Sequence, residues 1–220
     1  MPQTMTEKIL ARACGRASVK PGDDIMARPD FVIAYDFPGY TDVFFRETRE
    51  DFGVEKVPSP ERFVLFIDHM VPAAAPKEEE LHKMTRAWGK EQGVPVYERE
   101  GIGHQVSAER GYATPGAFAV HFDGHVSQLG AFGTYAFGAR KGVIEPFVSE
   151  TMALTVPATV KVELVGALQP GVMARDVFHH MVRVMGPSSC AFKVVELCGP
   201  VIDAMSIEGR QTLCGQAMFL

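Results

Sequence analysis

The sequence predicts an α/β protein, in which short apolar segments form a sheet and amphipathic segments form the helices that cover it. The run RFVLFI at 62–67 is too short and too continuously apolar for a surface helix, so it is interpreted as a buried strand. Longer charged segments with helical spacing, such as 76–92, alternate with runs of this kind. A fresh alternating strand begins after Pro157. We therefore expect a three-layer α/β/α domain over 1–156 and a second, smaller and incomplete α/β unit over 157–220.

The N-terminal segment is predicted to form a short amphipathic helix. Thr6 is placed to cap it, Ile9 and Leu10 supply an apolar face, and Gly15 ends it. The strands expected after this helix are 31–35, 62–67, 94–97, 118–122, 159–166 and 190–199. The further helices expected are 42–52, 76–92, 144–154, 177–185 and 203–220.

The clearest helical pattern lies at 76–92. This segment begins with proline, has acidic residues in its first turn, and places Leu81, Met84 and Trp88 at helical spacing. Its run of glutamates is interpreted as a solvated face. His82 falls outside the apolar stripe, so we expect a surface histidine there.

Composition excludes several classes of protein. The 220 residues are 46% hydrophobic and 22% charged, which fits a globular chain able to bury a sizeable core. The net charge is −5 and the isoelectric point about 5.8, with basic residues scattered, so no nucleic-acid partner is expected. No apolar run is long enough for a membrane helix, and the N-terminus lacks the apolar core of a secretory signal. These features predict a cytoplasmic protein without a membrane partner.

The cysteines do not form a recognisable metal or disulfide motif. Cys14, Cys190, Cys198 and Cys214 are widely spaced, with no C-x-x-C among them. We expect reduced thiols, mostly buried as small hydrophobic side chains. No residue of the chain is assigned as a metal ligand.

Candidate catalytic residues stand where polar groups follow apolar runs. Asp68 and His69 follow VLFI, and Asp123 and His125 follow AFAVHF within the glycine-rich stretch 101–138, which also holds His104. Polar residues at the carboxyl ends of parallel strands are typical of α/β binding crevices. A histidine beside an acid has a raised pKa, so its imidazolium can donate a proton near neutral pH. The alternative is that each is a structural histidine of a turn. An α/β dehydrogenase is disfavoured, because no G-x-G-x-x-G follows a strand.

Several motifs resemble one family along nearly the whole chain. They are MARPDFVIAYD at 26–36, DHMVP at 68–72, His104-Gln105, GYATPGAFAVHFDGHVSQLGAFGTYAFG at 111–138 and MSIEGRQTLCGQA at 205–217. In this order they resemble the N-terminal part of the aconitase and 3-isopropylmalate dehydratase (homoaconitase) large-subunit family. The resemblance implies an aconitase-like α/β fold. It also implies a hydro-lyase of amino-acid biosynthesis that isomerises a hydroxy di- or tricarboxylate by eliminating and readding water.

The resemblance also assigns roles to residues. Asp68 and His69 would be the proton-donating pair, with His104, Asp123 and His125 around the departing hydroxyl. Tyr35 and Gly124 would occupy substrate-binding positions. Gly124 stands where the family has the serine of Asp-Ser-His, and Phe219 where an acid is expected to orient a site histidine. The alternative is a cluster-free, non-catalytic paralogue or fragment that binds a carboxylate or a partner subunit.

The same resemblance implies a cofactor and partners. The complete family carries a [4Fe–4S] cluster on three cysteine thiolates from a later region, and those ligands are absent from this chain. The isolated chain is therefore expected to be inactive. A small-subunit-like swivel domain is one expected partner. Self-association is the other possibility, because the expected helix over 203–220 ends in large apolar residues without a capping residue.

Overall fold

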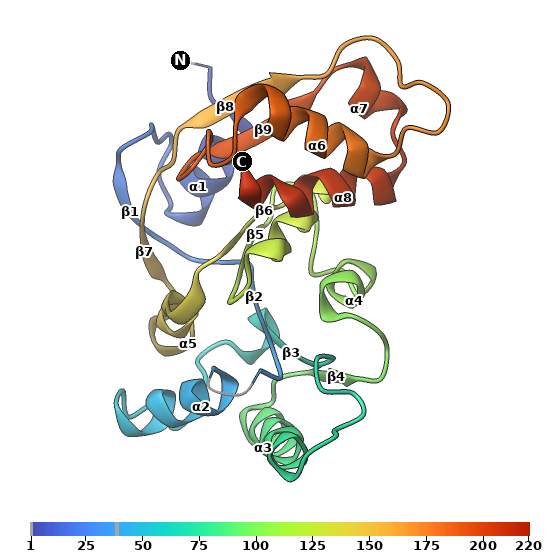
Figure 1. The fold of residues 1–220 in the computed structure, drawn as a ribbon. Helices are drawn as coiled ribbons and strands as arrows, with labels where there is room; N and C mark the ends of the chain where they lie inside the picture. The colour runs from blue at the N-terminus through green and yellow to red at the C-terminus, as the bar shows by residue number, and fades with distance from the viewer. Residues whose placement is uncertain (1, 38–39) are drawn as a thin grey trace.

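The centre of the molecule is a parallel sheet. The computed structural model describes residues 2–37 and 40–220, and within them five strands form this sheet in the order β4-β3-β2-β5-β6 (Figure 1). All of its pairings are parallel. Its strands are β2 (Phe31–Tyr35), β3 (Phe63–Ile67), β4 (Val96–Glu98), β5 (Phe118–His121) and β6 (Tyr135–Gly138). Every residue of β3 and β5 is buried, as expected for strands covered on both faces.

The strand order reverses direction at β2. The chain runs outward from β2 to β3 and β4, and then returns to place β5 on the other side of β2. Ala34 of β2 pairs with Leu65 of β3, and Val32 pairs with Val120 of β5. The carboxyl ends of β2 and β5 are therefore neighbours at a topological switch point, where open α/β sheets bind their ligands.

Helices cover both faces of the sheet, so the predicted three-layer arrangement is confirmed. One apolar cluster joins the sheet to α1, α2, α3 and α5, and another joins the opposite face to α4 and η2. The helices of this part are α1 (Met5–Ala13), α2 (Thr41–Glu50), α3 (Pro76–Gln92), α4 (Gly103–Glu109) and α5 (Ile144–Ser149), with short 3₁₀ segments η1 (Pro60–Arg62), η2 (Gly124–Phe132) and η3 (Arg140–Val143).

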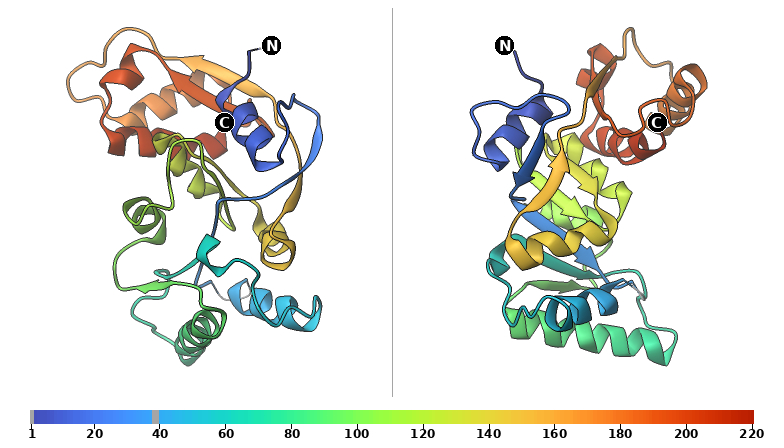
Figure 2. Two further views of the ribbon diagram at one scale, coloured as in Figure 1. Left: turned by 180° about the vertical axis from the view of Figure 1, so that it is seen from behind. Right: turned by 90° about the vertical axis from the view of Figure 1, so that its left-hand side faces the viewer.

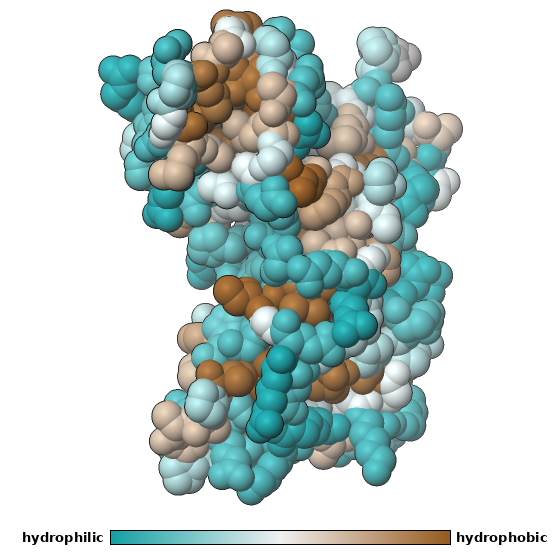
Figure 3. All heavy atoms as spheres, turned by 90° about the vertical axis from the view of Figure 1, so that its right-hand side faces the viewer, coloured by the Kyte–Doolittle hydropathy of each residue, from teal (hydrophilic) through white to brown (hydrophobic). Residues whose placement is uncertain are grey.

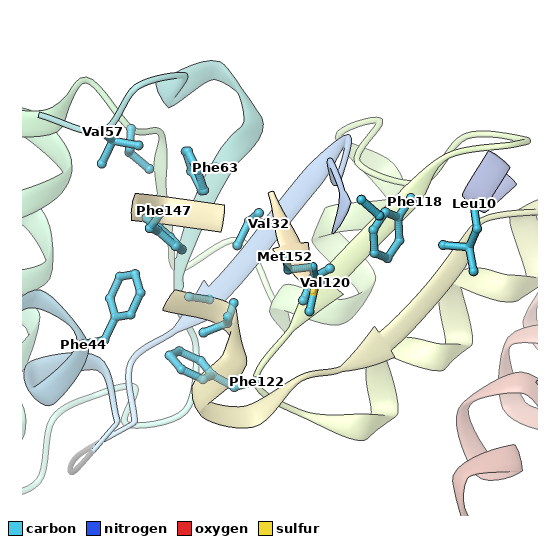
Figure 4. Close-up of a cluster of buried hydrophobic side chains, with 14 of the residues drawn as sticks. Leu10, Val32, Phe44, Val57, Phe63, Phe118, Val120, Phe122, Phe147 and Met152 are labelled. Carbon is cyan, nitrogen blue, oxygen red and sulfur yellow. The ribbon is translucent and has the colours of Figure 1, made fainter. Parts of the chain in front are cut away.

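Aromatic side chains fill the larger of the two clusters. Phe147 stacks on Phe63 with ring centroids 4.0 Å apart, and its edge contacts Phe44 at 4.2 Å. Figure 4 shows the cluster extending along one face of the sheet from Phe44 to Leu10. Burying an aromatic or aliphatic side chain of this size contributes about 1.5–3 kcal/mol to folding. This layer therefore stabilises the sheet on the face that it covers.

The N-terminal part packs beside the sheet through a separate strand pair. β1 (Asp24–Ala27) pairs antiparallel with β7 (Met152–Thr155), and α1 lies against this pair (Figure 2). The prediction that Thr6 caps α1 was wrong. Thr4 is the cap: its hydroxyl accepts the N–H of Glu7, and the Glu7 carboxylate accepts the N–H of Thr4. The helix expected over 144–154 was too long, because it ends at Ser149 and β7 follows.

The C-terminal part has its own small apolar cluster. In the described chain it contains β8 (Thr159–Glu163) and β9 (Val194–Cys198), paired in parallel, with α6 (Ala174–Met185), α7 (Pro200–Ala204), α8 (Ile207–Gln216) and η4 (Ala217–Phe219). α8 packs on η2, where the Ser127 hydroxyl donates to the carbonyl of Cys214 at 2.8 Å. This contact links the C-terminal part to the strand ends of the main sheet.

The continuous helix expected over 203–220 was wrong. Ser206 interrupts it, because its side chain accepts the N–H of Gly209 and so starts a new helix. Leu220 is only 2% exposed, and its carbonyl accepts the N–H of Cys190 at 2.5 Å. Phe219 is 48% exposed. The end of the chain therefore packs back on the turn that precedes β9.

Apolar side chains also reach the surface. Figure 3 shows them in separate patches, with hydrophilic residues between, on the side of the molecule where α4 lies. In the C-terminal part the most exposed apolar side chains are Val165, Met173, Val184 and Phe192. Within the described residues, none of the helices is long and apolar enough to cross a membrane.

Candidate active site

A group of acids and histidines lies at the carboxyl edge of the parallel sheet. His104 enters from the first turn of α4, just beyond β4. The other members follow β2, β3 and β5, and they are Asp36, the pair Asp68 and His69, and the pair Asp123 and His125. The structure thus brings together all the residues proposed from the sequence, with Tyr35 and Gly124 among them.

Asp36 is the buried centre of this edge and joins the ends of β2 and β3. Its carboxylate is fully buried and accepts the N–H groups of Asp68 at 2.7 Å, His69 at 3.0 Å and Met70 at 3.2 Å. It also contacts Nε2 of His82 at 2.9 Å. His82 is 5% exposed, so its prediction as a surface histidine was wrong. Its partner explains the burial, because a buried imidazole needs a hydrogen bond.

Asp68 and His69 form the closest acid–histidine pair. Nδ1 of His69 lies 2.5 Å from Oδ1 of Asp68, and the other oxygen of Asp68 accepts the N–H of Gly103. Burial alone would raise the pKa of Asp68, but the hydrogen bonds from His69 and Gly103 outweigh it and lower this pKa. The bond to Asp68 raises the pKa of His69 against the opposing effect of burial. The pair with Asp68 therefore favours the protonated form of His69.

Asp123 lies between two histidines. It caps η2 by accepting the N–H of His125 at 3.0 Å, and the same oxygen is 3.2 Å from Nδ1 of that residue. Its other oxygen lies 3.5 Å from Nε2 of His104. Burial would raise the pKa of Asp123, but the N–H of His125 and the nearby histidines lower it. Asp123 is therefore an anion that faces both rings.

His104 differs from His69 in its protonation. Burial lowers the pKa of His104, although the charges of Asp123 and Asp68 act in the opposite direction. Among the described residues its buried Nε2 has no hydrogen-bond partner. This nitrogen, which faces the Asp123 carboxylate at 3.5 Å, is available for a hydrogen bond with a ligand or a water. The environments of the site thus shift the pKa values of His69 and His104 in opposite directions.

The ring of Tyr35 packs near both His69 and His104. Its ring stacks on His69 with centroids 4.1 Å apart and lies 6.0 Å from the ring of His104. Burial raises the pKa of Tyr35, and the negative charge of Asp123 raises it further. Its hydroxyl therefore stays protonated and can serve as a hydrogen-bond donor.

His121 belongs to this group and escaped the sequence reasoning. It is the last residue of β5, is 1% exposed, and lies 4.5 Å from the ring of Tyr35 and 4.9 Å from that of His104. Within the run AFAVHF it looked like part of the strand rather than of the site. The available signal was the alternation of side chains along a strand. Residues 119 and 121 point to the same face of the sheet, and Tyr35 lies on that face.

The wall beside Gly124 and His125 is apolar. A Cβ added at Gly124 would lie 2.7 Å from Cε of Met218, so this methionine fills the space that a serine side chain would need. Phe219 presents its ring to His125 at a centroid distance of 5.9 Å and an angle of 68°. Both side chains come from η4, which therefore closes one side of the site.

A large cavity borders this site at Gly124 and Met218. Its volume is about 1120 Å³, and it separates β6 and β9 beneath α8. In the described chain its lining is mainly apolar and includes Tyr135, Phe137, Val194 and Leu197, without the acid–histidine pairs. The chemistry of the side chains, rather than the size of the hollow, therefore locates the candidate active site.

Gly138 supports the Asp123 turn, and its replacement by alanine is expected to destabilise the protein by about 1–3 kcal/mol. The added Cβ would lie 2.7 Å from the carbonyl carbon of Asp123 and from the nitrogen of Gly124, both backbone atoms. Urea denaturation gives the free energy of unfolding. Gly142→Ala is the matched control, since its nearest neighbour would lie 3.7 Å away. Equal stability of the two variants would show that the turn adjusts freely.

Together, these observations define an α/β protein whose acid–histidine pairs lie at the edge where open α/β sheets bind their ligands. Comparison with known sequences identifies the family. The chain belongs to the aconitase family (aconitate hydratase), whose sequence model matches residues 12–218.

Similar proteins cover nearly the whole chain. A probable methanogen homoaconitase large subunit from Methanothermobacter thermautotrophicus is 35% identical over 97% of this chain and 51% of its own length. The 3-isopropylmalate dehydratase large subunit 1 of Methanopyrus kandleri is 35% identical over 99% of this chain and 52% of its own length. The protein of the same name from Thermotoga maritima is also 35% identical, over 99% and 51%. The chain spans about half the length of these relatives.

The cysteines of this chain do not fit the [4Fe–4S] cluster of the family. Such a cluster needs several thiolates around one centre. Over residues 2–37 and 40–220, the only side chains close enough to share a metal ion are Asp36, Asp68 and His69. Asp36 already faces several N–H donors, which would repel a cation. Burial raises the pKa of the Cys214 thiol to about 11.

Proposed function

We propose that the chain forms the N-terminal part of a hydro-lyase that isomerises a hydroxy di- or tricarboxylate, of the 3-isopropylmalate dehydratase large-subunit type. One observation carries the proposal: His69, whose pKa is raised by its bond to Asp68, and His104, whose pKa is lowered by burial, face the same tyrosine ring. Water elimination needs a proton donor for the departing hydroxyl, and His69 supplies it. The names of the relatives support the substrate class.

The proposed elimination assigns a role to each group. His69 gives its Nε2 proton to the hydroxyl, the carbon–oxygen bond breaks, and water leaves. Asp68 stabilises the imidazolium before the transfer. His104 and the Asp123–His125 pair hold the departing water. The neighbouring carbon loses its proton and the freed electron pair forms the double bond; the acceptor of this proton is assigned to no residue of this chain. Readdition follows the reverse path.

A partner is part of the proposal. The relatives are named large subunits, which implies a small subunit beside them. Met218 and Phe219 are about half exposed next to His125, so the partner's contribution to the site would meet the chain there. We also propose that the chain associates with itself or with another chain through 203–220, because Met218 and Phe219 are exposed there.

A turnover assay tests the function. The chain is assayed alone and mixed with the C-terminal half of the Methanopyrus kandleri large subunit and its small subunit, using malate, citrate and 3-isopropylmalate. Formation of a conjugated alkene is followed by ultraviolet absorbance. We expect turnover of a hydroxy carboxylate only in the mixture containing this chain. Saturable binding of the assembled chain to these acids without any alkene would instead support a non-catalytic carboxylate-binding paralogue.

The pH profile of the assembled enzyme should depend on Asp68. Activity that requires protonated His69 is present below the pKa of His69 and is lost as pH rises through it. The bond to Asp68 is the largest cause that raises this pKa. Asp68→Asn is therefore expected to move the alkaline limb of kcat/KM to lower pH. If the alkaline limb of kcat/KM lay at the same pH in both proteins, His69 would not be the group that transfers the proton.

A further inference from the structure

His121 is bonded to the backbone of the site. Its Nδ1 lies 2.9 Å from the backbone nitrogen of Asp123, whose N–H therefore points at the ring. The side chain is almost completely buried at the end of β5. This contact spans the turn at which the chain leaves the sheet and enters η2.

This bond fixes the chemical state of the ring. An Nδ1 that accepts an N–H cannot carry a proton, so the proton of the neutral ring is on Nε2. Burial, with the nearby rings of His104 and His69, holds the pKa of His121 well below its ordinary value. His121 therefore remains a hydrogen-bond acceptor at Nδ1.

Burying an imidazole at this position costs free energy unless its polar atoms form hydrogen bonds. Its neighbours along β5 are Phe118, Ala119 and Val120, all fully buried and apolar. An apolar residue at 121 would continue this strand but would leave the N–H of Asp123 without an acceptor, at a cost of about 1–3 kcal/mol. The histidine satisfies the N–H and packs on Tyr35.

We propose that His121 is a positioning residue that fixes the Asp123 turn and so places the Asp123 carboxylate between His104 and His125. The direction in which the Asp123 carboxylate points is set by the backbone of Asp123. The N–H of that backbone is hydrogen-bonded to the His121 ring. Any consequence for water elimination rests on the proposed function. The positioning itself does not, and it can be measured in the 220-residue chain without turnover.

Two substitutions separate the acceptor from the volume of the ring. His121→Phe keeps a planar ring and removes the acceptor, whereas His121→Asn keeps an oxygen near the position of Nδ1. Amide hydrogen exchange at Asp123 is expected to become about tenfold faster in His121→Phe. It should stay close to wild type in His121→Asn. His180→Asn, on the exposed face of α6, is the control.

The decisive readout is the pKa of His104, followed by NMR of isotope-labelled histidine. The groups that face its ring are Asp123, Asp68, His125, His69, Tyr35 and His121. When Asp123 is released, His104 loses the largest interaction that favours its protonated form. Its pKa should therefore fall further in His121→Phe and be restored in His121→Asn. An unchanged pKa in folded His121→Phe, or equal shifts in both variants, would overturn the proposal.

The wild-type chain gives a test that needs no variant. A scalar coupling across the hydrogen bond should connect the amide nitrogen of Asp123 with Nδ1 of His121, and its absence would overturn the proposal even if His121→Phe failed to fold. These measurements are independent of turnover. An inactive assembly with the expected coupling and pKa change would refute the proposed function and retain the positioning role. An active assembly without the coupling and without the pKa change would retain the proposed function and refute the positioning role.

Discussion

Replacing Asp36 by alanine is expected to lower the free energy of unfolding by about 3–5 kcal/mol. The substitution removes the acceptor for the N–H groups of Asp68, His69 and Met70, and it leaves the buried His82 without its partner. These groups are shielded from water, which cannot replace the lost hydrogen bonds. Urea denaturation monitored by circular dichroism gives the measurement.

Two further variants make this test specific. Asp36→Asn retains one acceptor oxygen, so its loss of stability should be smaller than that of alanine. Asp51→Ala removes an exposed carboxylate after α2 and should change stability by no more than about 0.5 kcal/mol. If Asp36→Ala were as stable as Asp51→Ala, Asp36 would not be the centre that joins the ends of β2 and β3.

Replacing His69 by asparagine is expected to lower kcat of the assembled enzyme by about 10²–10⁴-fold, the usual contribution of a general acid. Asparagine can contact Asp68 but cannot give a proton to the departing hydroxyl. His69 sits 30% exposed at the mouth of the site, so the substitution should leave the fold intact. Steady-state kinetics with the substrate found in the turnover assay provide the rates.

The control for this experiment is His180→Asn, since His180 lies on the exposed side of α6. Its kcat should equal that of the wild type. A decrease of less than about tenfold in His69→Asn would show that another group protonates the hydroxyl. A large increase in KM with unchanged kcat would instead indicate that His69 binds the substrate without reacting.

The sequence was sufficient to predict β2, β3, β4 and β5 of the parallel sheet and the convergence of the strand-end residues, but it missed β6 (Tyr135–Gly138). Buried parallel strands are continuously apolar, as in FVLFI at 63–67, and their carboxyl ends must meet at one edge. Whether Asp68, His69, His104, Asp123 and His125 act in catalysis stays a prediction. The structure gives their contacts, and the experiments above address their roles.

The buried polar residues could not be predicted from local patterns. His82 looked solvated because the apolar stripe of α3 was drawn through Leu81, Met84 and Trp88. Met84 is in fact 38% exposed, and the buried face includes Thr85 and Gly89. The partner of His82 is Asp36, 46 residues away in sequence, and no helical spacing reports such a contact. His121 was overlooked for a similar reason, because its hydrogen bond forms only when the strand turns into η2.

The C-terminal part shows a further limit of periodicity. The apolar residues of 203–220 suggested one helix, but the Ser206 cap divides it and the end packs on the turn before β9. A serine followed three residues later by a glycine is a weak capping signal on its own. Tertiary packing of Leu220 decided the path of the chain.

Isotope incorporation during turnover tests the central claim most directly. The assembled enzyme is given the unsaturated acid in water enriched in the heavy oxygen isotope, and the hydroxy acid formed is analysed by mass spectrometry. If the site adds water across the double bond, the new hydroxyl carries solvent oxygen, and His69→Asn slows its appearance with the same fold-change as kcat. A hydroxy acid formed without solvent oxygen, or labelled at an undiminished rate by His69→Asn, would contradict water elimination and readdition at this site.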